Sequence, residues 1–199
     1  ALSVVRVGRL DPVLIATEKA RAIGQGGLLE LHEDVAALDD IGWLDRLKGW
    51  IRKRRGLFSE DARDFGIEPP KGVLTMGLPG GGKGLSAKAV AHEWRLPLLR
   101  LDMSGIFGSL VGESEQNLKE ALKIASATAP AILWVDEVEK ALSGTGGAST
   151  DGGTTQRVFG NFLTWLQEKD APVFVYFTAN DITKLPPELM RKGRVDERF

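Results

Sequence analysis

The stretch that decides the fold is Gly77-Leu78-Pro79-Gly80-Gly81-Gly82-Lys83-Gly84. It lies between an apolar run at residues 73–76, which predicts a buried strand, and a run at residues 84–94, which predicts a helix. Glycines let backbone N–H groups turn toward phosphate oxygens, the helix N-terminus adds its dipole, and Lys83 adds a positive charge. The sequence therefore predicts a phosphate-binding loop, with contacts from Pro79, Gly80, Gly81, Gly82, Lys83, Gly84 and Leu85.

One position departs from the usual pattern of such loops. After the lysine the pattern has Ser or Thr, whose hydroxyl ligates Mg²⁺, and here Gly84 takes that place. Ser86 comes two residues later, so we expect it to point to another side of the helix. Water can fill the missing position, because Mg²⁺ usually keeps several water ligands. We expect weaker Mg²⁺ binding and slower hydrolysis than with a hydroxyl.

The rest of the chain alternates strand and helix. Apolar runs at residues 98–101, 132–135 and 173–177 predict further strands, as expected for parallel strands covered on both faces. Two helical faces are marked by Leu118, Leu122 and Ala125, and by Val158, Phe162, Trp165 and Leu166. Residues 143–155, rich in Gly, Ser and Thr, predict a loop. The alternation predicts an α/β fold with a central parallel sheet, a three-layer αβα sandwich.

The lead-in to this region is expected to be helical. Residues 11–25 predict a helix that glycines then end, and residues 44–55 place Leu44, Leu47 and Ile51 on one helical face. We divide the chain into a lead-in, residues 1–34, and an α/β domain, residues 35–199. Both ends look cut, and a further strand is expected where the chain stops at Phe199.

Polar residues follow two of the predicted strands. Asp136 and Glu137 come directly after residues 132–135, and Asn180 ends the strand that begins at residue 173. Carboxylates at the carboxyl end of a parallel strand lie beside a phosphate loop on a neighbouring strand. We expect Asp136 to hold Mg²⁺ through water, Glu137 to orient or deprotonate the attacking water, and Asn180 to reach the γ-phosphate or that water. A solvated acidic turn is the alternative for the carboxylates.

Two arginines, Arg191 and Arg194, follow in a polar segment. Two interpretations stay open for them. They are either exposed surface residues or arginine fingers, which neutralise transition-state charge in a neighbouring subunit and therefore need an oligomer.

The composition narrows the range of functions. The chain has 199 residues, 43% hydrophobic and 27% charged, with a net charge of -1, so no global basic field attracts nucleic acid or anionic lipid. No apolar run approaches the length of a membrane helix, and no signal peptide is visible. The basic run at residues 52–55 is interpreted as a solvated helix end. There is no cysteine, and His32 and His92 lack a partner at metal-ligand spacing, so both are expected at the surface or in packing.

Taken together, these stretches resemble the motifs of AAA+ ATPases, and the spacing of the two arginines points to the AAA clade in the narrow sense. The resemblance to the Walker A, Walker B, sensor 1 and second-region-of-homology motifs lies at residues 77–83, 132–137, 178–180 and 191–194. Asp40-Ile41-Gly42 is similar to that clade's lead-in, whose backbone packs on adenine. The resemblance implies ATP and Mg²⁺ as ligands and self-association into a ring, with a hexamer as the expected form.

A closer resemblance is to the AAA-domain proteins of plastids and cyanobacteria. It rests on residues 26–30, 96–102, 110–115 and 185–189. It implies a domain before Ala1 and a helical lid after Phe199. Relatives grip substrate with an aromatic residue before Val111, where this chain has Leu110. A protein substrate is therefore expected near Leu110 and Val111, with threading left open.

The sequence is compatible with three functions. The first is an ATP-hydrolysing ring motor that remodels a protein partner, which the full set of Glu137, Asn180, Arg191 and Arg194 favours. The second is a nucleotide-dependent switch or scaffold with weak hydrolysis, which Gly84 favours. The third, a nucleic-acid motor, is disfavoured by the near-neutral charge. The expected location is the cytoplasm, or the plastid stroma if the source bears plastids.

Overall fold

The computed structural model contains one six-stranded sheet with the strand order β1-β3-β4-β5-β2-β6. It describes residues 15, 18, 27–33, 36–107, 113–142, 152–191 and 193–199. The strands are β1 (Leu29–His32), β2 (Gly72–Met76), β3 (Leu98–Leu101), β4 (Ala131–Val135), β5 (Val173–Ala179) and β6 (Glu197–Arg198). Strands β2 to β6 pair in parallel, and β1 pairs antiparallel with β3. The predicted strands are confirmed, and β6 forms at the predicted place near Phe199.

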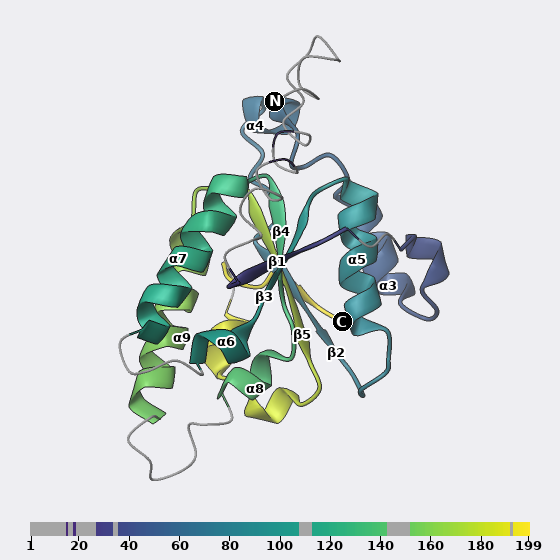
Figure 1. Cartoon of the computed structure of the whole chain (residues 1–199). Helices are drawn as coiled ribbons and strands as arrows, with labels where there is room; N and C mark the ends of the chain where they lie inside the picture. Colours follow the sequence, from purple (N-terminus) through teal and green to yellow (C-terminus); the bar gives the residue numbers. More distant parts are fainter. Residues whose placement is uncertain are drawn as a thin grey trace.

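Helices cover both faces of the sheet, so the predicted three-layer αβα sandwich is confirmed (Figure 1). The α-helices are α3 (Asp45–Lys53), α4 (Glu60–Asp64), α5 (Lys83–Trp94), α6 (Met103–Phe107), α7 (Glu113–Thr128), α8 (Val138–Leu142) and α9 (Gly152–Glu168). Within the described residues, three short 3₁₀ helices are η2 (Leu38–Asp40), η4 (Ile182–Lys184) and η5 (Pro187–Met190). Helices α3 and α5 pack on one face, while α7 and α9 pack on the other.

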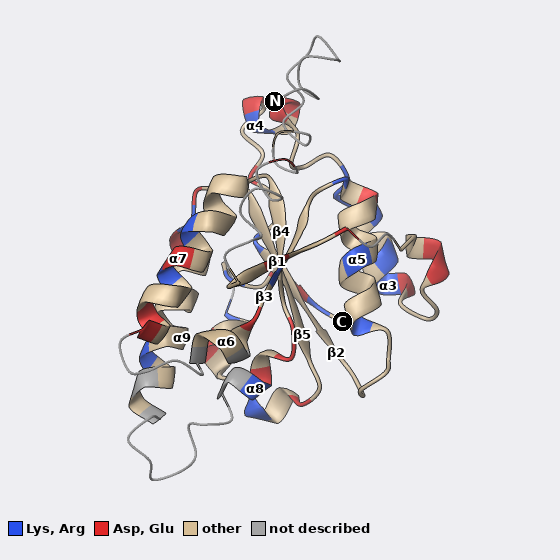
Figure 2. Cartoon of the chain, viewed as in Figure 1, with Lys and Arg blue, Asp and Glu red and all other residues tan. Residues whose placement is uncertain are grey.

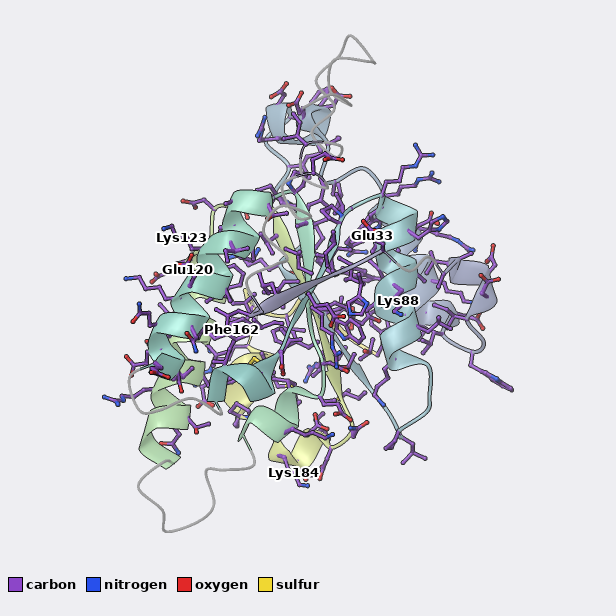
Figure 3. All side chains as sticks on the ribbon, viewed as in Figure 1. Glu33, Lys88, Glu120, Lys123, Phe162 and Lys184 are labelled. Atoms are coloured by element: carbon purple, nitrogen blue, oxygen red, sulfur yellow. The ribbon has the colours of Figure 1, made fainter. Side chains whose placement is uncertain are left out.

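Strand β5 shows why the sheet is buried on both sides. All seven of its residues are buried, and successive side chains point to opposite faces. Phe174 and Tyr176 enter the layer beneath α3 and α5, whereas Val175 and Phe177 enter the layer beneath α7 and α9. In that second layer, Phe162 of α9 packs edge-on against Phe177, with ring centroids 5.8 Å apart (Figure 3). The apolar runs in the sequence therefore reflect two separate core layers.

The structure adds features that the sequence did not predict. Strand β1 lies in the expected lead-in and makes one edge of the sheet antiparallel, so the sheet is mostly but not wholly parallel. Helix α9 begins at Gly152, within the loop predicted for residues 143–155. The helix predicted at residues 11–25 falls, apart from residues 15 and 18, outside the described residues.

The arginines of the basic run at the end of α3 contact other residues of the same chain. Arg52 Nη2 lies 2.5 Å from Asp39 Oδ1, and Arg55 Nη1 lies 3.6 Å from Glu93 Oε1. The guanidinium of Arg54 stacks 3.9 Å from the ring centroid of Trp50. These contacts support the interpretation of the run as a solvated helix end. No helix among the described residues is both long and apolar enough to cross a membrane.

A charged cluster lies at the amino ends of β2 and β5. Asp196 Oδ2 accepts hydrogen bonds from the backbone N–H groups of Lys71 and Gly72, at 2.7 and 2.9 Å. Burial, and then the charge of Lys71, lower the pKa of Lys169 to about 8, although Asp196 acts in the opposite direction. The folded state therefore disfavours the charged form of Lys169.

Candidate functional site

The loop between β2 and α5 has a backbone that requires glycine. Gly80 and Gly82 have φ angles of 80° and 77°, in the left-handed region that other residues rarely adopt. Gly82 is the N-cap of α5, and without a side chain it offers the first turn no cap. The first amide groups of the helix are therefore free to bind an anion such as a phosphate.

The predicted phosphate lysine points back into this loop. Lys83 Nζ donates hydrogen bonds to the carbonyl oxygens of Gly77 and Leu78, at 2.7 and 2.8 Å. The ammonium thus lies against the backbone of the loop, where a phosphate would replace the carbonyls as its partner. This geometry fits a β- or γ-phosphate and supports the prediction for Lys83.

Gly84 faces an aromatic ring of β4. A Cβ built on Gly84 would lie 3.1 and 3.2 Å from Cζ2 and Cη2 of Trp134, closer than ordinary van der Waals contact. Ser86 is fully buried and turned elsewhere: its Oγ donates to the carbonyl of Lys83 at 2.6 Å and lies 2.7 Å from the hydroxyl of Tyr176. The hydroxyl of Ser86 is therefore engaged within the core, between α5 and β5.

Asp136 is held by donors from the strands on either side of β4. Thr178 of β5 donates its hydroxyl to Asp136 Oδ1 at 2.5 Å, and Nη2 of Arg100, on β3, lies 3.3 Å from Oδ2. The Thr178 hydroxyl also accepts a hydrogen bond from the backbone N–H of Glu137 at 2.9 Å. The carboxylate is therefore fixed in direction at the carboxyl end of the sheet.

Glu137 and Asn180 meet, as expected for the ends of adjacent parallel strands. Asn180 Nδ2 donates to Glu137 Oε1 at 2.9 Å, and Lys140 Nζ forms an ion pair with Glu137 Oε2. The hydrogen bonds from Lys140 and Asn180, together with the charges of Lys140 and Lys83, hold the pKa of Glu137 below its usual value, against the raising effect of burial. Glu137 is therefore ionised at neutral pH. It also has a φ of 49°, unusual for a residue with a side chain.

Charged side chains gather at this end of the sheet. Figure 2 shows acidic segments where the parallel strands end and both signs of charge on α8, close below them. The backbone N–H of Asn180 donates to Glu139 Oε1 of α8 at 2.9 Å, which joins α8 to the end of β5. The backbone N–H of Gly77 donates to the carbonyl of Ala179 at 3.2 Å, so the glycine loop begins beside the end of β5 and the same cluster.

Residues 40–42, which resemble the segment that packs on adenine, lie beside α5. Ile41 is buried in the core layer that contains α5, while Asp40 and Gly42 are exposed. Asp40 Oδ2 accepts a hydrogen bond from the backbone N–H of Ala37 at 3.0 Å, which fixes the turn of η2. Trp43 follows with a φ of 69° and an almost fully exposed side chain. The structure thus places residues 40–42 next to the helix that begins at the glycine loop.

The two arginines differ in their surroundings. Arg194 donates from Nη1 to the carbonyl of Glu188 at 2.7 Å and from Nη2 to Gln167 Oε1 at 3.2 Å. Arg191 has an exposed side chain at the end of η5. Arg194 is therefore fixed to its own chain, whereas the side chain of Arg191 is exposed. Leu110 and Val111, the expected substrate contacts, lie outside the described residues.

The donor groups fit a nucleotide with a metal ion. The glycine loop and the amino end of α5 suit phosphates, and the carboxylate of Asp136 is the oxygen ligand that Mg²⁺ prefers. Gly84 contributes no ligand, so Mg²⁺ would be held by Asp136, water and the phosphates themselves. Sequence reasoning gave no sign of Arg100 and Lys140 as site residues, and it placed Thr178 in the stretch that resembles sensor 1 without assigning it a role.

These features define a P-loop nucleotide-binding domain, and the comparison with known proteins gives its family. Residues 73–199 match the family described as "ATPase family associated with various cellular activities (AAA)". The chain belongs to the AAA family of ATPases, as the sequence motifs predicted.

Individual relatives agree with this assignment. Two proteins described as "Uncharacterized AAA domain-containing protein ycf46", from Guillardia theta and Pyropia yezoensis, are 48% and 52% identical over 195 and 186 residues. The alignments cover 98% and 94% of this chain and 38% of each relative. A protein of the same description from Trieres chinensis is 44% identical over 94% of this chain and 37% of its own length. The chain thus spans less than two-fifths of the curated relatives it matches.

Proposed function

We propose that this chain is the ATP-hydrolysing domain of a ring-forming motor that remodels a protein partner. The observation that carries the proposal is the contact between Asn180 Nδ2 and Glu137 Oε1, 2.9 Å long, next to Asp136 and beside the start of the glycine loop that carries Lys83. A carboxylate base, an amide that orients it, a metal-binding carboxylate and a phosphate lysine are the parts that hydrolysis of a phosphoanhydride needs.

Each group has a separate task in this mechanism. The first amides of α5 and Lys83 bind the phosphates and neutralise the charge that develops in the transition state. Asp136 would hold Mg²⁺, which would supply further positive charge to the phosphates. Glu137, ionised at neutral pH, accepts a proton from the attacking water, and Asn180 holds the carboxylate in direction. Lys140 must release Oε2 if water is to reach that oxygen.

The ring is proposed from the position of Arg191. Its exposed side chain lies at the C-cap of η5, beyond the end of β5. An arginine finger from a neighbouring subunit is worth about 10³–10⁵ in rate. We assign the finger to Arg191, and we assign Arg194 to fixing the segment that carries it. The protein partner and a location in the cytoplasm or plastid stroma belong to the same proposal.

A nucleotide-dependent switch with weak hydrolysis is the second candidate. Two observations favour it: Gly84 supplies no metal ligand, and both carboxylate oxygens of Glu137 are engaged by Lys140 and Asn180. In a switch, ATP would control assembly and turnover would be slow at every protein concentration.

The rate of ATP hydrolysis against protein concentration separates the two candidates. The measurement uses the chain and the Glu137→Gln variant at several Mg²⁺ concentrations, with the assembly state followed by light scattering. The motor predicts a specific activity that rises as subunits assemble and disappears in Glu137→Gln. A rate that is low, independent of assembly and equal in both proteins would rule out the motor.

A further inference from the structure

Arg100 lies in a row of side chains that crosses three neighbouring strands. Glu30 of β1 pairs in register with Arg100 of β3, and Arg100 pairs with Trp134 of β4. Residues opposite one another in register point to the same face of a sheet. This face is the one covered by α5, the helix that begins at the glycine loop (Figure 1).

The guanidinium of Arg100 has three partners. Nη2 lies 3.3 Å from Asp136 Oδ2, Nη1 lies 3.8 Å from Glu30 Oε2, and the central carbon lies 5.2 Å from the ring centroid of Trp134. The charge is therefore held beside the carboxylate that the site offers to a metal. Because the side chain is 41% exposed, water partly screens that charge.

The same region offers the metal few other ligands from the protein. Gly84 has no hydroxyl, and the ring of Trp134 occupies the space next to its Cα. Ser86 is bound to Tyr176 and faces the sheet. Asp136 is left as the predicted protein ligand, and it is shared with a permanent cation.

We propose that Arg100 is a positioning residue that sets the magnesium dependence of nucleotide binding. Its guanidinium orients Asp136 and competes with Mg²⁺ for Oδ2. In metal-free nucleotide complexes it provides part of the positive charge that Mg²⁺ would otherwise supply. The inference rests on the proposed function, since it concerns the same nucleotide site. Binding of nucleotide is then less dependent on Mg²⁺ than it would be without Arg100.

The test compares neutral and charged replacements. Arg100→Gln and Arg100→Met remove the charge, and Arg100→Met keeps an apolar stem against Trp134. Arg100→Lys keeps the charge. Arg157→Gln is the matched control, because it removes a cation that pairs with Glu115 on the other face of the sheet. The affinity of a fluorescent ADP analogue is measured with EDTA and with Mg²⁺, and the metal affinity of the ADP complex is measured by Mn²⁺ resonance with Mg²⁺ as competitor.

Neutral variants should bind Mg²⁺ about three- to tenfold more tightly in the ADP complex. The ratio of the Kd for ADP in EDTA to that in Mg²⁺ should rise by the same factor, because binding linkage is reciprocal. Arg100→Lys should stay near the wild-type ratio, and Arg157→Gln should not change it. An unchanged ratio in the folded neutral variants, or weaker Mg²⁺ binding, would overturn the inference. Failure of the wild type to bind ADP in either condition would instead overturn the proposed nucleotide site.

Discussion

Gly84→Ser is the most informative single change, because it adds the hydroxyl that the loop lacks. The new Cβ would lie 3.1 Å from Trp134 Cζ2, so the ring must recede by a few tenths of an ångström. Adding an atom to a packed layer costs about 1 kcal/mol, and Ser is better than Gly in a helix by about 0.5 kcal/mol. The free energy of unfolding should therefore fall by about 0.5 kcal/mol, which lowers Tm by about 1–2 °C in a domain of this size.

The functional effect should be larger than the effect on stability. A hydroxyl that ligates Mg²⁺ should lower the Mg²⁺ concentration for half-maximal nucleotide binding by about tenfold, equal to about 1.4 kcal/mol. The assay is a Mg²⁺ titration at fixed fluorescent ATP analogue, with Tm measured on the same samples.

Gly84→Ala is the matched control, because it brings the same Cβ against Trp134 without an oxygen. It should leave the Mg²⁺ dependence unchanged. If Gly84→Ala shifts the titration as much as Gly84→Ser does, the effect comes from the Trp134 ring. If neither folded variant shifts it, another ligand fills the position and the reasoning about the missing hydroxyl is refuted.

Four further predictions concern other residues. Lys83→Ala should weaken ATP binding at least about tenfold, since a charged phosphate contact is lost; wild-type affinity in a fluorescence titration would contradict the assignment. Glu137→Gln should bind ATP normally and release phosphate ~10²–10⁴-fold more slowly; unchanged turnover would exclude it as the base. Arg191→Ala and Arg194→Ala should both bind ATP and hydrolyse it poorly, and each should regain some turnover when mixed with Glu137→Gln subunits. No recovery in confirmed mixed assemblies would argue against a finger acting between subunits. Lys169→Met should raise the free energy of unfolding at pH 7 by about 1–2 kcal/mol, because the native state disfavours the charged lysine. Urea titrations should show the full gain in the free energy of unfolding below pH 8 and a smaller gain as the pH rises toward 10.5. A gain that does not depend on pH would refute the electrostatic cause.

Most of the fold could be predicted because buried parallel strands must be apolar on both sides. The runs that form β2, β4 and β5 are buried almost throughout and stand out from their surroundings, and β3 does so except at Arg100. Strand β1 does not, because its four residues include a glutamate and a histidine. Its polar residues find their partners on β3 and β4, about 70 residues or more away in sequence, so local pattern gives no sign of them.

The candidate site also contains residues whose positions could be predicted and residues whose positions could not. Asp136, Glu137 and Asn180 could be predicted, because each follows a recognisable strand and parallel strands end together. Arg100 and Lys140 could not. In the sequence, Arg100 has the pattern of a polar strand position and Lys140 that of a solvated helix residue. Only the register of β3 on β4, and the turn that leads into α8, bring their charges onto the two carboxylates.

The left-handed backbone at Glu137 lowers the stability of the folded state at a residue with a proposed chemical role. A side chain at a φ of 49° costs of order 1 kcal/mol relative to a relaxed conformation, and glycine or asparagine would tolerate that conformation better. The local backbone preference and the requirement for a carboxylate therefore oppose each other at this one residue. A lineage selected for heat resistance alone would be expected to lose the glutamate, so the proposed role of Glu137 as the base implies a cost in thermal stability at this position.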